Sequence, residues 1–220
     1  MIKKRTLFLI ICVAVLCIST AQTRAAMMFE YISNNSGLAD DIVPQLSMIV
    51  TDAGSNQVLF TFYNSGGITA SISDIYFDDG SLLGISSIVE PAGVDFETST
   101  LFAPALPQGN LLDPDFVTTA GFWAATIPPP TGTWGVDAGE SVGILFNLDS
   151  GKTYQNVLAA LGQGFIDASV AGSLRIGINV QIPGGTGALS DSFILVPVPA
   201  AVLLGILGLG VVGIKLRKYA

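Results

Sequence analysis

The chain has 220 residues, a formal net charge of −8, no histidine and only two cysteines. Without histidine it cannot build Ser-His-Asp or Cys-His nucleophilic sites, and it lacks the most versatile zinc ligand. Both cysteines, Cys12 and Cys17, lie near the N-terminus. The chain after residue 25 therefore has no disulfide and depends on its hydrophobic core for stability.

The N-terminal 25 residues have the three parts of a secretory signal peptide. A basic segment (residues 3–5) precedes an uncharged run (7–18), and the small residues Ala21 and Ala25 offer two cleavage sites. A lipoprotein signal at Cys17 is the alternative. A leucine stands before this cysteine, where such signals need a small residue, so we favour the ordinary signal peptide.

Residues 26–195 form the predicted exported domain, which is strongly acidic. It holds all 17 acidic residues and only two basic ones, Lys152 and Arg175, so its formal charge is −15. Because binding to phosphates requires Lys or Arg, we expect no nucleic-acid partner. Solubility outside the cell is the simplest interpretation of this charge, and weak binding of divalent cations is the alternative. The length suits one domain.

Strand patterns recur along this domain. Runs of apolar and β-branched residues predict strands at 57–63, 68–77, 82–89, 139–148, 174–182 and 191–195. Asn-Ser-Gly-Gly and Asp-Asp-Gly turn sequences separate the first three, which predicts an antiparallel meander.

The fold class follows from these patterns and from one helical segment. In 174–182 apolar residues alternate with polar ones, which predicts a strand with one buried face. The spacing of apolar residues predicts a short helix over 153–161 that ends at Gly162 or Gly164. We therefore expect an all-β fold, a single β-sandwich or jelly-roll-like domain with one short helix.

Residues 90–135 are rich in proline, which prevents long strands, so we expect a large irregular insertion here. Trp123 and Trp134 lie on either side of a run of three prolines. Together with Phe122 they are candidate ligand contacts, as an exposed aromatic platform for sugars or partner chains. The alternative is that these aromatic residues cover one end of the core.

Acidic residues are the other candidate ligand contacts. Asp78 and Asp79 precede a glycine, a sequence typical of a structural turn. No calcium-binding loop of the form D-x-D-x-D-G is present, so we predict no metal site and no cofactor. A glycosidase, which needs two carboxylates across a cleft, is a remote alternative. Its candidates would be Asp78, Asp79, Asp113, Asp115 and Glu140. We predict no catalytic residues and no enzyme activity.

The C-terminal segment, residues 196–220, has three parts in a fixed order. A Pro-x-Pro motif comes first, consisting of Val196, Pro197, Val198 and Pro199. The uncharged run 198–214 would span about 25 Å as a helix, enough to cross a bilayer core. The basic residues Lys215, Arg217 and Lys218 follow and should stop translocation, which places the domain outside and the C-terminus inside. A buried core helix is the less favoured alternative.

This tail resembles the PEP-CTERM sorting signal of bacterial envelope proteins, which an exosortase processes. The matching residues are Pro197, Pro199, the run 200–214, Lys215, Arg217 and Lys218, while Val198 stands at the glutamate position. The resemblance implies a non-enzymatic surface or extracellular-matrix component of the cell envelope. Its implied partners are the membrane and an exosortase-type enzyme, with an extracellular polysaccharide as a further candidate. A carbohydrate- or calcium-binding surface module is the alternative function.

Overall fold

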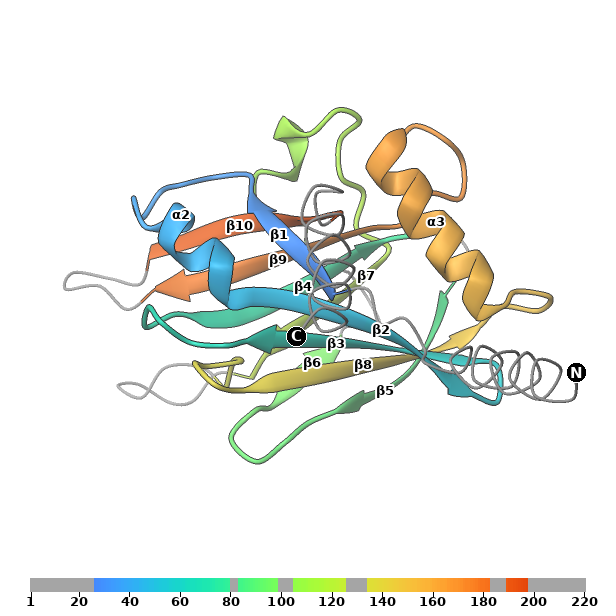
Figure 1. Ribbon diagram of the computed structural model, residues 1–220, viewed down its shortest axis with the longest axis horizontal. Helices are drawn as coiled ribbons and strands as arrows, with labels where there is room; N and C mark the ends of the chain where they lie inside the picture. Colours follow the sequence, from blue (N-terminus) through green and yellow to red (C-terminus); the bar gives the residue numbers. More distant parts are fainter. Residues whose placement is uncertain (1–25, 80–82, 99–104, 126–133, 183–188, 198–220) are drawn as a thin grey trace, which may run out of the picture.

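The computed structural model of the chain describes residues 26–79, 83–98, 105–125, 134–182 and 189–197. This part contains ten β-strands in one antiparallel sheet and two α-helices (Figure 1). The strands are β1 (Ala26–Tyr31), β2 (Leu46–Gly54), β3 (Gln57–Asn64), β4 (Ser71–Asp78), β5 (Leu83–Val89), β6 (Phe96–Thr98), β7 (Ala120–Ala124), β8 (Ser141–Leu148), β9 (Arg175–Ile182) and β10 (Leu189–Val196). The helices are α2 (Ala39–Ile42) and α3 (Tyr154–Ile166), with 3-10 turns η2 (Val43–Gln45) and η3 (Gly109–Leu111). The prediction of an all-β fold is confirmed in the coarser sense that the chain is mostly β, but the described residues form two α-helices where one was predicted.

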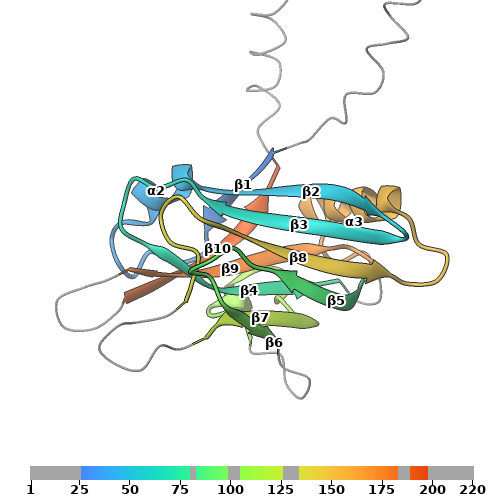
Figure 2. The ribbon, with the colours of Figure 1, turned by 90° about the horizontal axis from the view of Figure 1, so that it is seen from below.

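The sheet is curled so that its two halves face each other. The strand order is β5-β8-β3-β2-β1-β10-β9-β4-β7-β6. The strands β1 and β10, at the two ends of the described chain, therefore pair in the middle of the sheet. Figure 2 shows the two halves as layers on either side of this joint. The rings of Phe60 on β3 and Phe77 on β4 are only 5.2 Å apart, although their strands lie in different halves of the sheet. The hydrophobic core therefore fills the space between the halves.

Aromatic side chains dominate the centre of this core. Phe77 packs edge to face against four other rings, those of Phe60, Phe62, Phe122 and Phe146, with centroid distances of 4.8 to 6.2 Å. All five side chains are fully buried. Such ring pairs contribute about 0.5 to 1.5 kcal/mol each beyond the burial of apolar area. The alternating sequence of β3 presents two of these rings to the same face.

The predicted meander is wrong. Strand β3 lies between β2 and β8, whereas β4 lies between β9 and β7, and β5 pairs with β8. The 65–70 connection thus crosses from one half of the sheet to the other. Buried Asn64 holds it, because its amide nitrogen donates to the carbonyl oxygens of Ala70 and Val136. The turn residues mark where β3 ends but do not specify its partner.

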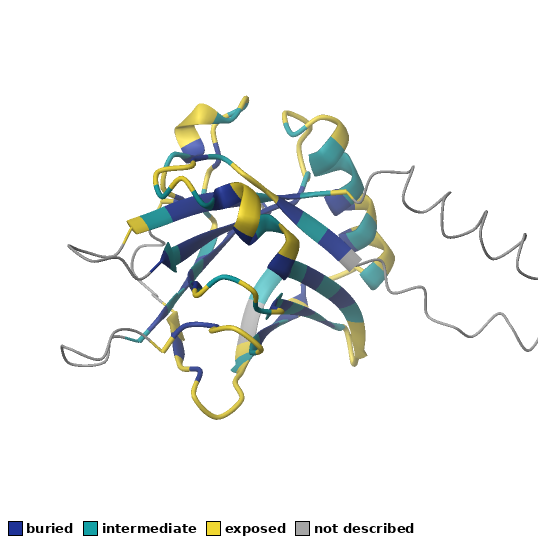
Figure 3. Cartoon of the chain, turned by 60° about the vertical axis from the view of Figure 1, so that its left-hand side comes forward, coloured by how far each residue is buried: buried dark blue, intermediate teal, exposed yellow. Residues whose placement is uncertain are grey.

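Residues 90–135 are less irregular than predicted, because β6 and β7 lie within them and extend the sheet beyond β4. The loop 105–119 covers the outer face of β9 at Arg175 and Gly177. Strand β9 is consequently buried on both faces for most of its length, and the prediction of a single buried face is wrong. Figure 3 shows buried residues along the strands and exposed residues mostly in the connections.

Helix α3 is longer than predicted. The side chains of Thr153 and Asn156 form a reciprocal capping box at its start. It continues through Gly162 and Gly164 to Ile166, so neither glycine ends it. A Cβ atom at Gly164 would lie 2.3 Å from the carbonyl oxygen of Leu174, which shows that this glycine permits a close approach to the chain leading into β9.

The ends of the described chain leave the sheet together. In the β1–β10 pair, Met28 lies opposite Val196, so residues 26 and 197 are at the same end of two adjacent strands. Val196 ends β10. The predicted signal peptide, the predicted helix at 198–214, and the residues Val198, Pro199, Lys215, Arg217 and Lys218 lie outside the described residues. No helix within the described ranges is long and apolar enough to cross a membrane.

Candidate functional site

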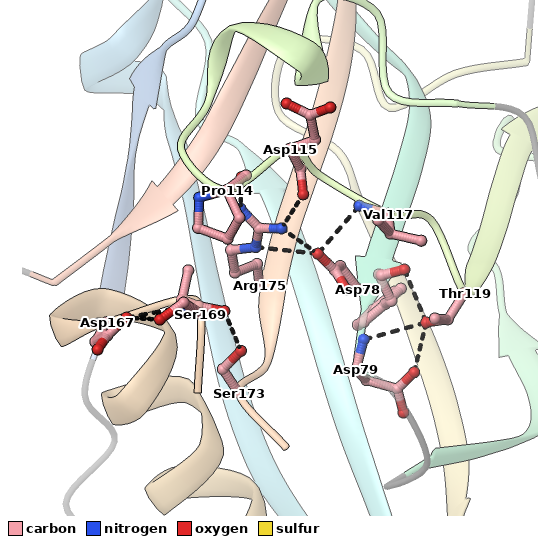
Figure 4. A network of polar contacts seen from close by, with 12 residues as sticks. Asp78, Asp79, Pro114, Asp115, Val117, Thr119, Asp167, Ser169, Ser173 and Arg175 are labelled. Atoms are coloured by element: carbon pink, nitrogen blue, oxygen red, sulfur yellow. Dashed lines mark hydrogen bonds and ion pairs between the residues drawn. The ribbon is translucent and has the colours of Figure 1, made fainter. Parts of the chain in front are cut away.

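Two of the predicted ligand contacts, Asp78 and Asp79, lie at the end of β4 in a polar network (Figure 4). One carboxylate oxygen of Asp78 accepts hydrogen bonds from Nε of Arg175 at 3.0 Å and from its Nη2. The same oxygen accepts a bond from the backbone of Val117 at 3.2 Å. Arg175 begins β9 directly opposite Asp78, so strand register brings this ion pair together.

The guanidinium of Arg175 also holds the loop over the outer face. It donates to the carbonyl oxygens of Pro114 and Asp115, both at 2.6 Å. Its central carbon, Cζ, lies 5.2 Å from the centre of the Phe116 ring. Only 9% of the Arg175 side chain is exposed. We call this set of contacts, made by Arg175 with Asp78 and residues 114–116, the arginine clamp.

Asp79 has a similar structural setting. Its carboxylate accepts from the hydroxyl of Thr119 and from the backbone of Leu83 at 2.8 Å, and the residue is 4% exposed. These bonds connect the end of β4 with the start of β5 and with the residue before β7. The contacts of both acidic residues within the domain account for their positions without a ligand.

A small second hydrophobic cluster lies beneath the covering loop. It consists of Tyr76, Leu106 and Phe116, and Leu106 sits directly over Gly177, where a Cβ atom would be 2.6 Å from its side chain. Burial, and secondly the charge of Asp74, raise the pKa of the Tyr76 hydroxyl well above its ordinary value of 10.0. The outer face of β4 and β9 is therefore buried where the loop covers it.

Beside the covered area, three side chains form a row across neighbouring strands. Trp123 on β7 is the register partner of Asp74 on β4, which is the register partner of Asn179 on β9. Register partners share one face of a sheet, with Cβ atoms about 4.5 to 5.5 Å apart. Phe122, which precedes Trp123, and Ile75, which follows Asp74, are fully buried in the core. Successive residues of a strand point to opposite faces of the sheet. Trp123, Asp74 and Asn179 therefore point away from the core, and we call them the outer-face row.

The polar members of the outer-face row are linked but not saturated. Oδ2 of Asp74 accepts from the Ser73 hydroxyl at 2.6 Å and from the Asn179 amide nitrogen at 3.2 Å. Oδ1 of Asn179 is buried and has no hydrogen-bond donor among the described residues. An unpaired buried acceptor costs about 1 to 3 kcal/mol. The row thus combines a half-buried indole, a carboxylate and an amide with an unused acceptor.

The two tryptophans do not form one platform with Phe122, because Phe122 is a core residue. Trp134 is 39% exposed, and its backbone bonds to Ala125 and Asp95 at the ends of β7 and β6. No ring contact joins its indole to that of Trp123, both of which the structure describes. The structure instead places Trp123 beside Asp74, a neighbour that the sequence did not indicate.

Two further kinds of site, a metal site and a pair of glycosidase carboxylates, have little support in the described ranges. They contain no group of three or more His, Cys, Asp or Glu residues that could hold a metal ion. Glu140, considered for a glycosidase, accepts a bond from the backbone of Asp137 within its own turn at 2.9 Å. No family model, no curated protein and no solved structure matches the chain.

Proposed function

We propose that the chain is an exported, non-enzymatic protein of the bacterial cell envelope. The tail 196–220 anchors it by a single helix, with the domain outside, and an exosortase-type enzyme then processes it for release or attachment at the surface. The tail sequence carries this proposal. Pro197 and Pro199 precede an uncharged run, and Lys215, Arg217 and Lys218 end it.

The position of the chain ends supports the proposal. Because β1 and β10 are neighbours, the predicted signal peptide and the tail join the domain at one end of the sheet. Either segment can then enter a membrane while the whole domain stays on one side. The sorting motif begins where β10 ends, at Val196, so it directly adjoins the folded domain.

The nature of the domain is also consistent with life outside the cell. Its formal charge of −15 favours solubility and mutual repulsion, and its core is built without disulfides. We class the curled sheet as a β-sandwich, because its halves pack face to face across the Phe77 cluster.

Replacement of the three basic residues tests the membrane topology. Changing Lys215, Arg217 and Lys218 together to Asn removes three positive charges, each of which would cost about 2.5 to 3.5 kcal/mol at the bilayer centre. We expect the C-terminus of this variant to become accessible to protease added outside intact cells. The control is Lys152→Asn, a single exposed basic residue of the domain, which should leave the C-terminus protected. A C-terminus that stays protected in the triple variant would refute the stop-transfer role.

A further inference from the structure

We propose that the outer-face row binds a neutral polysaccharide of the β-glucan class. In this arrangement Trp123 stacks against the C–H face of one sugar ring, Asp74 accepts hydrogen bonds from hydroxyl groups, and Asn179 supports Asp74 through its amide nitrogen. The site belongs to the folded domain and needs neither the tail nor its processing, so the two proposals can fail separately.

Trp123 provides the stacking surface. Its side chain is partly exposed on the outer face, and register places Asp74 on one side of it and Glu97 on the other. An aromatic ring with polar neighbours suits a ligand that has an apolar face and a polar rim. Sugar rings have this form. Rings of β-linked glucose have only equatorial hydroxyls, so both faces present C–H groups that lie flat on an indole.

Asp74 provides an acceptor for hydroxyl groups. Oδ2 of Asp74 is used within the row, but its other oxygen makes no hydrogen bond to a described residue. Asn179 is buried beside it, and its amide nitrogen donates to Oδ2 of Asp74 and so holds the carboxylate in place. A sugar hydroxyl group that binds in the row can donate a hydrogen bond to the other oxygen of Asp74. Since hydrogen bonds to charged groups contribute about 1.5 to 3 kcal/mol, Asp74 should account for much of the affinity.

Charge identifies the ligand as neutral. Arg175 is engaged in the arginine clamp, and the only other basic residue of the domain, Lys152, follows β8 in the opposite half of the sheet from the row. With Asp74 and Glu97 beside the indole, phosphate or uronate groups would be repelled.

Adjacent strands are about 4.8 Å apart, so the row from Trp123 to Asn179 extends about 10 Å. That length accommodates more than one sugar ring, which favours a chain over a monosaccharide.

The two tryptophans of the chain allow a direct test by fluorescence. The full chain is prepared in mild detergent as Trp134→Phe, which leaves Trp123 as the only indole, and as Trp123→Phe, which leaves Trp134. Both are titrated with cellohexaose and laminarihexaose at up to millimolar concentration. We expect a saturable change in the emission of Trp134→Phe and none in Trp123→Phe. No change in either protein, or the same change in both, would overturn the proposal.

A pair of acidic variants tests the polar contacts in the Trp134→Phe background. Asp74→Asn should weaken binding about tenfold or more, because it replaces a charged acceptor. Asp40→Asn, an exposed acidic residue on α2, is the matched control and should bind like its parent. Equal affinity of the two variants would overturn the assigned role of Asp74. Equal binding of an acidic oligogalacturonate would overturn the assignment to neutral chains.

Discussion

Arg175 shows how a single residue can organise the domain. Residues 26–195 contain 17 acidic residues and only two basic ones, and Arg175 is a basic residue that is buried and paired rather than placed on the surface. Its pairing to Asp78 joins β9 to β4, and its bonds to residues 114 and 115 attach the covering loop. The sequence alone did not indicate this role, because Asp78 and Arg175 are far apart in the chain.

Removing the arginine clamp should therefore destabilise the domain. Arg175→Met keeps the packing on Phe116 but removes the guanidinium donor, so that the Asp78 carboxylate keeps only the backbone N–H of Val117 and the carbonyl oxygens of Pro114 and Asp115 lose this partner. Breaking a fully buried ion pair in this way costs about 3 to 5 kcal/mol, and we expect the lower end of this range because the Asp78 side chain is 18% exposed. Urea unfolding of residues 26–197 measures the loss. Lys152→Met, at an exposed position, should change the free energy of unfolding by less than about 0.5 kcal/mol. Equal stability of the two variants would contradict the clamp.

Tyr76 makes the domain sensitive to alkaline pH. Because the pKa of its hydroxyl is raised in the folded state, both states are neutral below pH 10, and above it only the unfolded state ionises. Stability should thus fall as the pH rises from 10, by about 1.4 kcal/mol at pH 11 from this group alone. Urea unfolding of the parent and of Tyr76→Phe at pH 7 and pH 11 isolates the contribution of Tyr76 to the loss of stability. The variant should lose less stability; an equal loss in both proteins would contradict the assignment.

At the scale of elements, two glycines of α3 should respond to alanine in opposite directions. A Cβ atom at Gly162 would meet no other atom within 4 Å, so Gly162→Ala should stabilise the helix by roughly 0.5 to 1 kcal/mol. At Gly164 the same atom would collide with the carbonyl oxygen of Leu174, which is backbone and cannot rotate away. Gly164→Ala should cost about 1 to 3 kcal/mol. Thermal unfolding measures the melting temperatures of the two variants. Shifts of the same sign would contradict the close packing of α3 against Leu174.

Most strands could be predicted from local pattern, but their partners could not. The runs at 57–63, 82–89 and 174–182 agree with β3, β5 and β9 to within a residue or two. β1, β2, β6 and β7 were missed, although β7 carries Trp123. Periodicity and turn residues act over a few positions, whereas pairing depends on contacts between distant segments. The wrong meander and the unexpected burial of the outer face of β9 both follow from this limit.

The candidate site was predictable only in part for the same reason. Trp123 was identified from the sequence, because an indole in a proline-rich region is conspicuous. Asp74 and Asn179 were not identified, since only strand register brings them beside it. Conversely, Asp78 and Asp79 were identified as acidic residues at a turn, and their bonds within the domain became visible only in the structure.

At the scale of the whole molecule, the paired terminal strands connect the fold with the proposed export. Strands β1 and β10 join the two halves of the sheet, and the tail follows β10 without a linker. Cleavage within the Pro-x-Pro motif would remove the tail and leave every described strand intact. The proposed processing is therefore compatible with a stable released domain.

The mass of the C-terminal peptide of the mature protein, isolated from its native envelope, tests the central claim most directly. We expect a C-terminus between Pro197 and Ala200, which would mean that the sorting motif is processed although Val198 replaces the glutamate. A C-terminus at Ala220 would contradict processing and make the tail a permanent anchor.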